Sequence, residues 1–162
     1  MTAHLPRRLV LELHLISDAP LQLTGRLDPA ALDLSEGERI HTAQPVSYDL
    51  TATPVGDEVL IEGHLSTVLA CRCDRCLAPF ELTVEAPDCC WTRETTGKER
   101  IDLTAQIRED IVVRLPFKLI CRPDCRGLCP QCQCNLNVDT CTCEPPPPDD
   151  DPWNVLDQLQ DR

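Results

Sequence analysis

Twelve cysteines constrain what this 162-residue chain can fold into more than any other feature of its sequence. Eight of them form closely spaced pairs, which are Cys73/Cys76, Cys121/Cys125, Cys129/Cys132 and Cys141/Cys143. A tight turn between two neighbouring cysteines aims both sulfur atoms at one ion, while backbone N–H groups stabilise the thiolates. The spacing therefore predicts a metal-binding protein, and thiolate sets of this kind are typical of structural zinc.

The N-terminal sequence favours a cytoplasmic protein. The segment from Leu9 to Ile16 alternates apolar and polar residues, with Glu12 and His14 interrupting it, and no small-residue cleavage site follows. No apolar run is long enough to span a membrane. Clustered cysteines in a reducing compartment are metal ligands more often than disulfides. We therefore expect a chain without a membrane contact and without a disulfide framework.

Tetrahedral zinc needs four ligands, so the cysteine pairs must combine. In one arrangement Cys121, Cys125, Cys129 and Cys132 close a single local site, and the N-terminal pair finds other partners. In the other arrangement the pairs form two sites, one from Cys73, Cys76, Cys121 and Cys125 and one from Cys129, Cys132, Cys141 and Cys143. The second arrangement leaves no half-filled pair and is preferred. It predicts two zinc ions per chain.

The remaining cysteines, which are Cys71, Cys89, Cys90 and Cys134, fall outside these pairs. Cys89 and Cys90 lie between strand signals, where buried free thiols are the ordinary interpretation. A lone CxxC pair is also found in redox proteins, and iron–sulfur clusters use four thiolates. No βαβ pattern surrounds the pair in this chain, and its cysteine spacings do not match those of ferredoxins. Both alternatives therefore rank below structural zinc.

The fold class that the sequence predicts is α+β and β-rich, with a small antiparallel barrel or a curled sheet and one or two helices. Residues 1–100, which include the first cysteine pair, are expected to form a strand-rich core. Short apolar or alternating segments between turn signals predict its strands, which are Leu9–Leu15, Leu21–Leu27, Val46–Ala52, Val59–Leu69 and Phe80–Glu85. The stretch from Pro29 to Gly37 is expected to be a short helix or a turn.

Residues 101–143 are expected to form a helix and a cysteine-rich zinc segment packed on this core. Asp102 is a suitable N-cap, and Leu103, Ile107, Ile111 and Leu115 follow at helical spacing until Pro116 ends the helix. Residues 144–162 are expected to form an acidic, proline-rich linker and then a short amphipathic helix. That proline-spaced helix begins near Asp151 and carries Trp153.

Enzyme signatures are missing from the sequence. It contains no GxGxxG motif, no phosphate-binding glycine loop and no nucleophile elbow. The four histidines, His4, His14, His41 and His64, are scattered rather than clustered. Catalytic zinc keeps an open coordination position, whereas thiolates are in surplus here. We therefore expect no enzymatic activity and no small-molecule substrate.

Four arginines lie within the cysteine-containing segments of the sequence, although the formal net charge of the chain is −12. These residues are Arg72 and Arg75 in the first group and Arg122 and Arg126 in the second. One explanation is electrostatic, because four thiolates around a divalent ion leave a net negative charge that arginine offsets. The other is a contact surface for RNA phosphates. The overall charge and the scarcity of aromatic residues favour the first explanation slightly.

Several motifs in these segments resemble the bacterial YceD family, named for large ribosomal RNA subunit accumulation and also described as a domain of unknown function. The stretch Cys73-Asp-Arg-Cys76-Leu-Ala-Pro-Phe80 is similar to the family's CxRCLxPF hallmark. The helix from Asp102 to Leu115, the run from Cys125 to Cys132 with Asn135-Leu-Asn137, and the closing Asp151-Pro-Trp153 also agree. The resemblance extends from residue 9 to residue 160. One departure is Gln133, where the family usually has glycine.

The resemblance implies a role in the synthesis, processing or accumulation of 23S rRNA, with no established biochemical activity. The function that we expect is therefore that of a non-enzymatic ribosome-biogenesis factor with structural zinc sites. Its partner would be a ribosome-assembly protein or pre-ribosomal RNA, contacted through Arg72, Arg75, Arg122, Arg126 and the helix of Trp153. The alternatives are a redox-responsive regulatory protein and a protein-interaction module unrelated to RNA.

Overall fold

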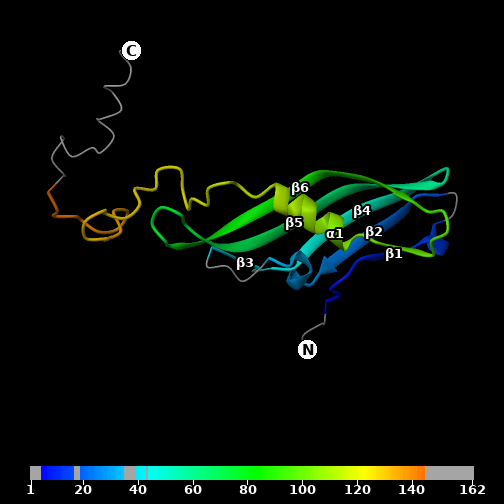
Figure 1. Ribbon diagram of the computed structural model, residues 1–162, viewed down its shortest axis with the longest axis horizontal. Coiled ribbons are helices and arrows are strands. Elements are labelled where there is room, and N and C mark those ends of the chain that lie inside the picture. Colours follow the sequence, from blue (N-terminus) through cyan, green and yellow to red (C-terminus); the bar gives the residue numbers. More distant parts are fainter. Residues whose placement is uncertain (1–4, 17–18, 35–38, 43, 145–162) are drawn as a thin grey trace, which may run out of the picture.

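The computed structural model describes residues 5–16, 19–34, 39–42 and 44–144, which form two antiparallel sheets and one α-helix (Figure 1). The strands are β1 (Val10–Glu12), β2 (Leu21–Leu27), β3 (Ile40–Thr42), β4 (Val46–Val55), β5 (Glu58–Arg72), β6 (Pro79–Glu94) and β7 (Arg100–Asp102). The helices are α1 (Thr104–Val113) and the short 3-10 turns η1 (Leu13–Leu15) and η2 (Pro29–Leu32).

Strand β5 is the centre of the larger, five-stranded sheet. On one edge it pairs first with β4 and then, nearer its C-terminal end, with β3. On its other edge it pairs with β6 over nearly its whole length, and β2 pairs with the outer side of β4. Strands β1 and β7 pair separately as a small second sheet. The prediction of a β-rich α+β fold with a curled sheet is confirmed, whereas the barrel alternative is wrong because the sheet does not close.

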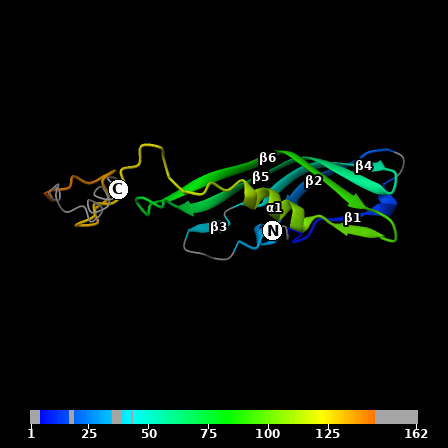
Figure 2. The ribbon, with the colours of Figure 1, turned by 45° about the horizontal axis from the view of Figure 1, so that its top comes forward.

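The β5–β6 hairpin is the longest element, with strands of 15 and 16 residues. Its last paired residues, Arg72 and Pro79, lie opposite each other, so residues 73–78 form the turn that connects the strands. That turn contains Cys73 and Cys76. The first cysteine pair is therefore held at one end of the sheet by the ladder of both strands, next to the segment that follows α1 (Figures 1 and 2).

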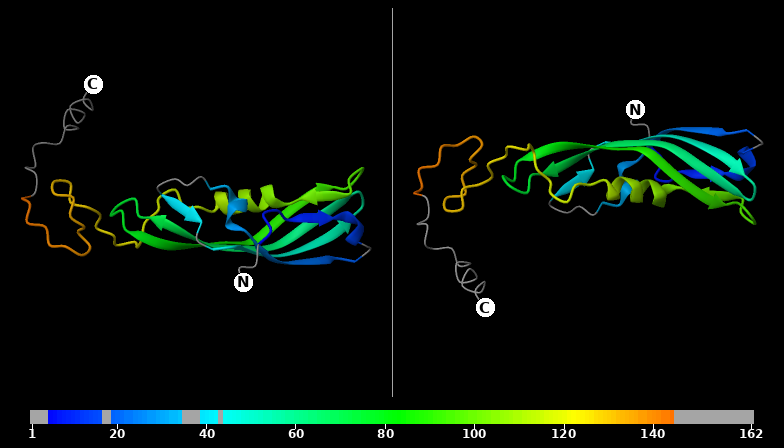
Figure 3. Two further views of the ribbon diagram at one scale, coloured as in Figure 1. Left: turned by 90° about the horizontal axis from the view of Figure 1, so that it is seen from below. Right: turned by 90° about the horizontal axis from the view of Figure 1, so that it is seen from above.

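Helix α1 lies across one face of the large sheet, as the side views show (Figure 3). It begins at Thr104, whose backbone N–H donates to the Asp102 carboxylate at 2.9 Å. Ile107 and Ile111 face the sheet and are fully buried. The predicted helix is thus confirmed with shorter ends, since Leu103 precedes it and Leu115 follows it. Pro116, which cannot continue a helix, turns the chain toward the second cysteine group.

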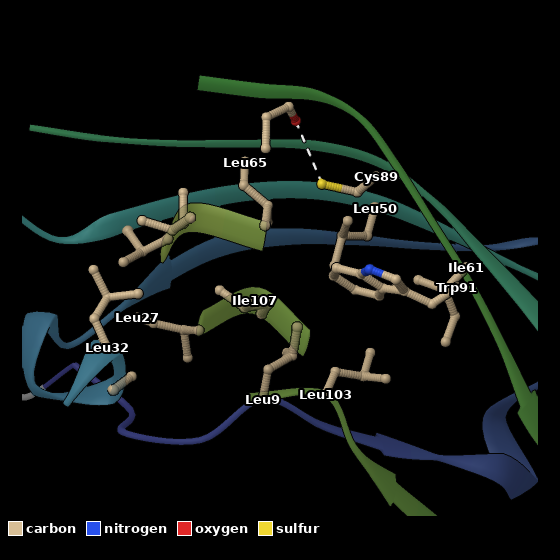
Figure 4. Packing of buried hydrophobic residues seen from close by; sticks show 14 of the residues in the cluster. Leu9, Leu27, Leu32, Leu50, Ile61, Leu65, Cys89, Trp91, Leu103 and Ile107 are labelled. Carbon is tan, nitrogen blue, oxygen red and sulfur yellow. Dashed lines mark hydrogen bonds between the residues drawn. The ribbon is translucent and has the colours of Figure 1, made fainter. Parts of the chain in front are cut away.

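The core fills the space between the sheet and the elements that cover it (Figure 4). Leu50, Ile61 and Leu65 come from the sheet, and Leu32 from η2 and Ile107 from α1 pack toward them. Full burial of each such aliphatic side chain contributes about 1.5–3 kcal/mol. This continuous and mainly aliphatic core packs the sheet against η2 and α1.

Several element boundaries differ from the sequence prediction. The first strand ends at Glu12 and continues as the turn η1, and β6 extends to Glu94 rather than Glu85. The short strands β3 and β7 were not predicted, because three-residue segments carry too little periodicity to identify. The predicted stretch from Pro29 is confirmed as the short helix η2. The predicted helix of Trp153 lies outside the described residues.

None of the helices that the structure describes is both long enough and apolar enough to cross a membrane. The division into residues 1–100, 101–143 and 144–162 stays a prediction.

Gly63 allows β4 and β5 to approach each other closely, at the point where the pairing of β5 with β6 shifts register. Its φ of +155° lies at the edge of the range that L side chains rarely adopt, and an added Cβ would lie 2.1 Å from the backbone oxygen of Asp49. The atoms nearest to this added Cβ belong to the backbone of β4, which cannot move aside as the end of a flexible side chain could. Gly56 also has positive φ, at +61°, but an added Cβ there would meet nothing within 4 Å.

We expect Gly63→Ala to destabilise the fold by at least about 3 kcal/mol, because the new methyl group collides with the neighbouring strand. Gly56→Ala is the matched control and should cost about 1–2 kcal/mol, the cost of left-handed backbone alone. Urea unfolding followed by circular dichroism measures both. Equal losses for the two variants would contradict the close approach at Gly63.

Candidate metal centres

Four sulfur atoms from two distant segments converge at the end of the β5–β6 hairpin. The Sγ atoms of Cys73, Cys76, Cys121 and Cys125 all lie within 4.8 Å of one another. Cys73 and Cys125 are 3.8 Å apart, and Cys76 and Cys121 are 3.7 Å apart. Three of the four side chains are buried, and Cys121 is half-buried. We call this set the first cysteine site.

A second set of four sulfur atoms lies within the segment that follows. The Sγ atoms of Cys129, Cys132, Cys141 and Cys143 also lie within 4.8 Å of one another. Cys141 is 3.8 Å from Cys132 and 3.4 Å from Cys129. Cys129 is buried and Cys132 is exposed, so this second cysteine site is more open to solvent than the first.

The eight cysteines therefore gather in the split arrangement that was preferred from the sequence. The alternative local set of Cys121, Cys125, Cys129 and Cys132 is not a group in the part of the chain that the structure describes. Their role as metal ligands stays a prediction.

The same backbone turn presents the CxxC pair of each site. In the first knuckle, residues 73–78, the N–H of Leu77 donates to the carbonyl of Cys73 at 2.9 Å, and the N–H of Cys73 donates to the carbonyl of Ala78 at 2.9 Å. In the second knuckle, residues 129–134, Gln133 donates to Cys129 at 2.9 Å, and Cys129 donates to Cys134 at 2.9 Å. Sequence spacing showed two CxxC pairs, and the structure shows that they fold alike.

The residue after each CxxC pair has left-handed backbone conformation. Leu77 has φ of 59° and Gln133 has φ of 60°. This conformation costs an L residue about 1–2 kcal/mol and costs glycine almost nothing. The departure noted at Gln133, where the resembling family usually has glycine, therefore falls at a position where glycine relieves backbone strain.

The distances fit a single ion surrounded by four thiolates. A tetrahedron of sulfur atoms about 2.3 Å from a central ion has edges of about 3.8 Å. The measured separations of 3.4–3.8 Å are close to that edge length. A disulfide would need about 2.05 Å between the sulfur atoms, and all of these cysteines are free. Each site can hold one tetrahedral metal ion.

Hydrogen bonds to sulfur favour a thiolate in each site. Burial by itself raises the pKa of the Cys73 thiol, but donation from the backbone N–H groups of Cys121, Cys76 and Arg75 outweighs burial and lowers the pKa to about 6. Backbone donors at Cys132 and Gln131 likewise lower the pKa of Cys129 to about 6. Each site therefore has at least one sulfur whose pKa favours the thiolate near neutral pH.

Another thiol in each site resists ionisation when no cation is near it. Burial, with neighbouring sulfur atoms adding to its effect, raises the pKa of Cys121 to about 12. Contact with the sulfur of Cys132 is the largest cause that raises the pKa of Cys143 to about 12. A cation among the sulfur atoms reverses this effect because it favours the ionised form of every ligand. The clusters are thus arranged for a positive ion rather than for four separate thiols.

Asp74 locks the first knuckle against the segment that leads to Cys121. Its carboxylate accepts from the Leu119 N–H at 2.8 Å and from two nitrogens of Arg39 at 3.0 and 2.7 Å. The Asp74 N–H in turn donates to the Leu119 carbonyl at 2.7 Å. Donation from Leu119, followed by Arg39, holds the pKa of Asp74 below its usual value. No sequence pattern indicated this role, although Asp74 lies inside the first CxxC pair.

Asn137 connects the two sites. Its side-chain NH₂ donates to the Sγ of Cys125 at 3.5 Å, and its side-chain oxygen accepts from the Arg126 N–H and from Arg122, both at 2.9 Å. Asn135 orients the same amide by accepting from it at 2.8 Å. The Asn135-Leu-Asn137 motif was noted in the sequence only as part of a resemblance. In the structure the Asn137 amide holds the Cys125 sulfur, the Arg122 side chain and the Arg126 N–H in place through hydrogen bonds.

Gly127 lets the two knuckles approach. It has φ of +79°, and an added Cβ would lie 3.1 Å from the carbonyl oxygen of Arg75. The neighbouring Leu128 N–H donates to that carbonyl at 3.1 Å. The chain between the second cysteine pair and the second knuckle therefore lies directly against the first knuckle.

The cysteines outside the sites have different surroundings. Cys71 and Cys89 are buried in the core, and burial raises the pKa of both thiols, that of Cys89 to about 12. Cys90 is exposed, so the prediction that Cys89 and Cys90 are both buried is wrong for Cys90, which points to the opposite face of β6. Cys134 lies in the second knuckle, and contact with Cys132 and Cys141 raises its pKa to about 12. It occupies the position that Ala78 has in the first knuckle.

The four arginines singled out in the sequence are all exposed around these sites. Arg75 donates to the Cys125 carbonyl at 3.0 Å, and Arg122 lies 3.4 Å from the Asp124 carboxylate as well as bonding to Asn137. These contacts place Arg75 and Arg122 beside the first cysteine site. They also leave the guanidinium groups at the surface.

The comparison with protein families confirms the resemblance for the C-terminal part of the chain. Residues 92–160 match the family model described as "Large ribosomal RNA subunit accumulation protein YceD". This range includes α1, the second cysteine group and the segment of Trp153. The CxRCLxPF hallmark at residues 73–80 precedes the matched range, so the wider resemblance from residue 9 stays a prediction.

Curated relatives come from mycobacteria and are uncharacterized. The chain is 36% identical over 103 residues to the uncharacterized protein Rv2926c of Mycobacterium tuberculosis, covering 54% of this chain and 49% of that protein. It is 31% identical over 108 residues to the uncharacterized protein ML1660 of Mycobacterium leprae, covering 57% and 50%. The match thus spans about half the length of these relatives. No solved structure matches the chain significantly.

We expect the purified protein to contain two metal ions per chain, one for each cysteine group. Cys73→Ser and Cys129→Ser should each lower the content to one ion, because each change removes a ligand from one site. Cys73→Ser should also lower the unfolding temperature more, since only the first site joins the hairpin to a distant segment. Elemental analysis by mass spectrometry and thermal unfolding measure these effects.

Cys134→Ala is the matched control for this experiment. It removes a thiol next to the second site and recreates the residue found at the equivalent position of the first knuckle, so metal content should not change. Wild-type protein that holds no tightly bound metal after purification under reducing conditions would contradict the assignment of both sites.

We expect Gln133→Gly to raise the free energy of unfolding of the metal-loaded protein by about 0.5–1 kcal/mol, because glycine removes the strain of left-handed backbone. Val138→Gly is the control. Val138 is also exposed in this segment but has no positive φ, so glycine there should bring no gain. Chemical denaturation compares the two variants, and a Gln133→Gly protein no more stable than wild type would disprove the assignment of strain.

Proposed function

We propose that the protein is a non-enzymatic, cytoplasmic factor in ribosome biogenesis that supports the synthesis, processing or accumulation of 23S rRNA. The observation that carries this proposal is the match of residues 92–160 to a family named for accumulation of the large ribosomal RNA. That range contains six of the eight paired cysteines, which are Cys121, Cys125, Cys129, Cys132, Cys141 and Cys143. The part of the chain that resembles the family therefore coincides with most of the cysteine sites.

The metal that we propose for both sites is zinc. Four thiolates with no water or imidazole ligand are a donor set of structural zinc. Each set is closed, because its four sulfur atoms already satisfy tetrahedral coordination. A closed site offers no open position at which a substrate or water could be activated, which supports a scaffold rather than a catalyst.

In this proposal the metal sites act by fixing shape. The first site ties the β5–β6 hairpin to the segment after α1, and Asn137 ties the first site to the segment of the second. Together they hold Arg72, Arg75, Arg122 and Arg126 on one end of the molecule. These arginines, together with the segment of Trp153, are the proposed contacts to a ribosome-assembly protein or to pre-ribosomal RNA.

The function can be tested in a strain that lacks or is depleted of the gene for this protein. We expect less mature 23S rRNA relative to 16S rRNA and fewer free large subunits in a sucrose gradient. Wild-type protein and Cys134→Ala should restore both quantities. Cys73→Ser, which is expected to lose the first metal, should restore them poorly at equal protein level, as measured by immunoblot.

Normal 23S rRNA and normal subunit ratios in the depleted strain would contradict the proposal. That outcome would favour an interaction module unrelated to RNA. If Cys73→Ser accumulates to wild-type level and restores 23S rRNA fully, the proposed dependence on the first metal site is wrong, while the role in biogenesis stands.

A further inference from the structure

An exposed aromatic ring lies beside basic side chains next to the first cysteine site. Phe117 follows α1 in the chain, and its side chain is 94% exposed. The other described aromatic residues differ from it, because Trp91 is buried and Tyr48 and Phe80 pack against the core. In a chain with only 3% aromatic residues, an aromatic ring left in water is an unusual placement.

This ring lines a surface cavity of about 370 Å³. The residues that line the cavity are Arg39, Asp74, Arg75, Phe117, Lys118 and Ile120. They come from three separate parts of the chain, which are the start of β3, the first knuckle and the segment after α1. The cavity is therefore created by the tertiary structure, and no single sequence motif marks it.

The walls of the cavity are held rigidly. Asp74 and Leu119 exchange two hydrogen bonds of 2.7 and 2.8 Å, which joins the first knuckle to the segment of Phe117 and Lys118. The Arg39 guanidinium donates hydrogen bonds from two nitrogens to the same carboxylate. The Arg75 side chain is anchored to the Cys125 carbonyl. A site held in this way loses little conformational entropy when a ligand binds.

The charge of the cavity is positive although the chain carries −12 overall. The Asp74 carboxylate is already satisfied by Arg39 and the Leu119 N–H, so it contributes no free negative group. Within the described residues, neither Arg75 nor Lys118 forms an ion pair with a carboxylate. A metal with four thiolates would leave a charge of about −2 near Arg75, which Arg75 and its neighbouring arginines offset. Lys118 stays available to an anion.

We propose that this cavity binds a nucleotide of single-stranded RNA, an inference that rests on the proposed function and specifies its partner. The base stacks on the Phe117 ring, and Lys118 contacts a phosphate group. A flat aromatic ring next to a cation is the arrangement with which proteins hold unpaired bases. The volume lies at the small end of ligand pockets, which suits one nucleotide.

The same features disfavour double-stranded RNA and an acidic peptide. Base pairs in a duplex are stacked on one another and offer no free face to Phe117. Acidic side chains would pair with Lys118 but have no aromatic face to place on the ring. The net negative charge of the rest of the protein weakens long-range attraction, so binding depends on these local contacts and falls steeply with added salt.

The test is fluorescence anisotropy of the full-length, metal-loaded protein with a labelled ten-nucleotide oligouridylate RNA at low salt. We expect Phe117→Ala to weaken binding by about 5- to 150-fold, because loss of one stacked base costs about 1–3 kcal/mol. Phe117→Trp should keep the affinity. Lys118→Ala should weaken binding and reduce the dependence on salt by about 0.7 in log–log slope. A duplex of equal length should bind more weakly.

Two control variants match these changes elsewhere on the surface. Val138→Ala removes an apolar side chain that is 80% exposed, and Lys98→Ala removes a lysine from the connection between β6 and β7, at the far end of the sheet (Figure 1). Neither should change RNA affinity. Because Phe117 and Lys118 are exposed, all variants should keep wild-type metal content and unfolding temperature, which are measured in parallel.

Failure to bind the RNA at low salt, or equal effects of Phe117→Ala and Val138→Ala, would overturn the inference. It would also be overturned if a peptide of residues 144–162 bound in a Phe117-dependent way while the RNA did not, since the cavity would then receive an acidic segment. The rRNA experiment is independent of this one. Normal 23S rRNA in the depleted strain, together with Phe117-dependent RNA binding, would refute the proposed function. The assignment of the cavity as a binding site for single-stranded RNA would still stand.

Discussion

The convergence of four sulfur atoms at the end of the β5–β6 hairpin is the interaction on which the C-terminal half depends. Cys73 and Cys76 are placed by two long paired strands, whereas Cys121 and Cys125 arrive from a segment without regular secondary structure. Such a segment has few backbone hydrogen bonds of its own and needs a strong external constraint to adopt one conformation. A divalent ion bound by the four thiolates would supply that constraint, and folding would then be coupled to metal binding.

The polar groups around the sulfur atoms extend this constraint to the surface. Asp74 ties the first knuckle to Leu119, and Asn137 ties Cys125 to Arg122 and Arg126. Each bond satisfies a backbone or side-chain group that would otherwise be left without a partner as the segment packs. The cavity beside Phe117 follows from the same contacts, because its walls belong to the segments that Asp74 joins. The proposed contact surfaces thus depend on the contacts around the first cysteine site.

Much of the architecture was predictable because it depends on local patterns. The predicted strands from Leu21 and Val46 and the helix containing Ile107 and Ile111 follow from alternation or helical spacing of apolar residues, and the structure has all three. Strand β3 and the C-terminal half of β6 could not be predicted in this way. The pairing of β3 with β5 is what makes it a strand, and β6 continues past Pro87 because its pairing with β5 resumes at Cys89 after a shift in register.

The sequence by itself determined that cysteine pairs would combine into four-sulfur sites, because CxxC spacing brings two sulfur atoms together whatever surrounds them. It left open which pairs combine, since a local set and a split set used the same residues. Only the tertiary structure decided this, by placing the hairpin turn against the segment after α1. It alone also gave Asp74, Asn137 and Phe117 their positions. These positions depend on contacts between segments far apart in the chain. Such contacts cannot be predicted from the spacing of neighbouring residues.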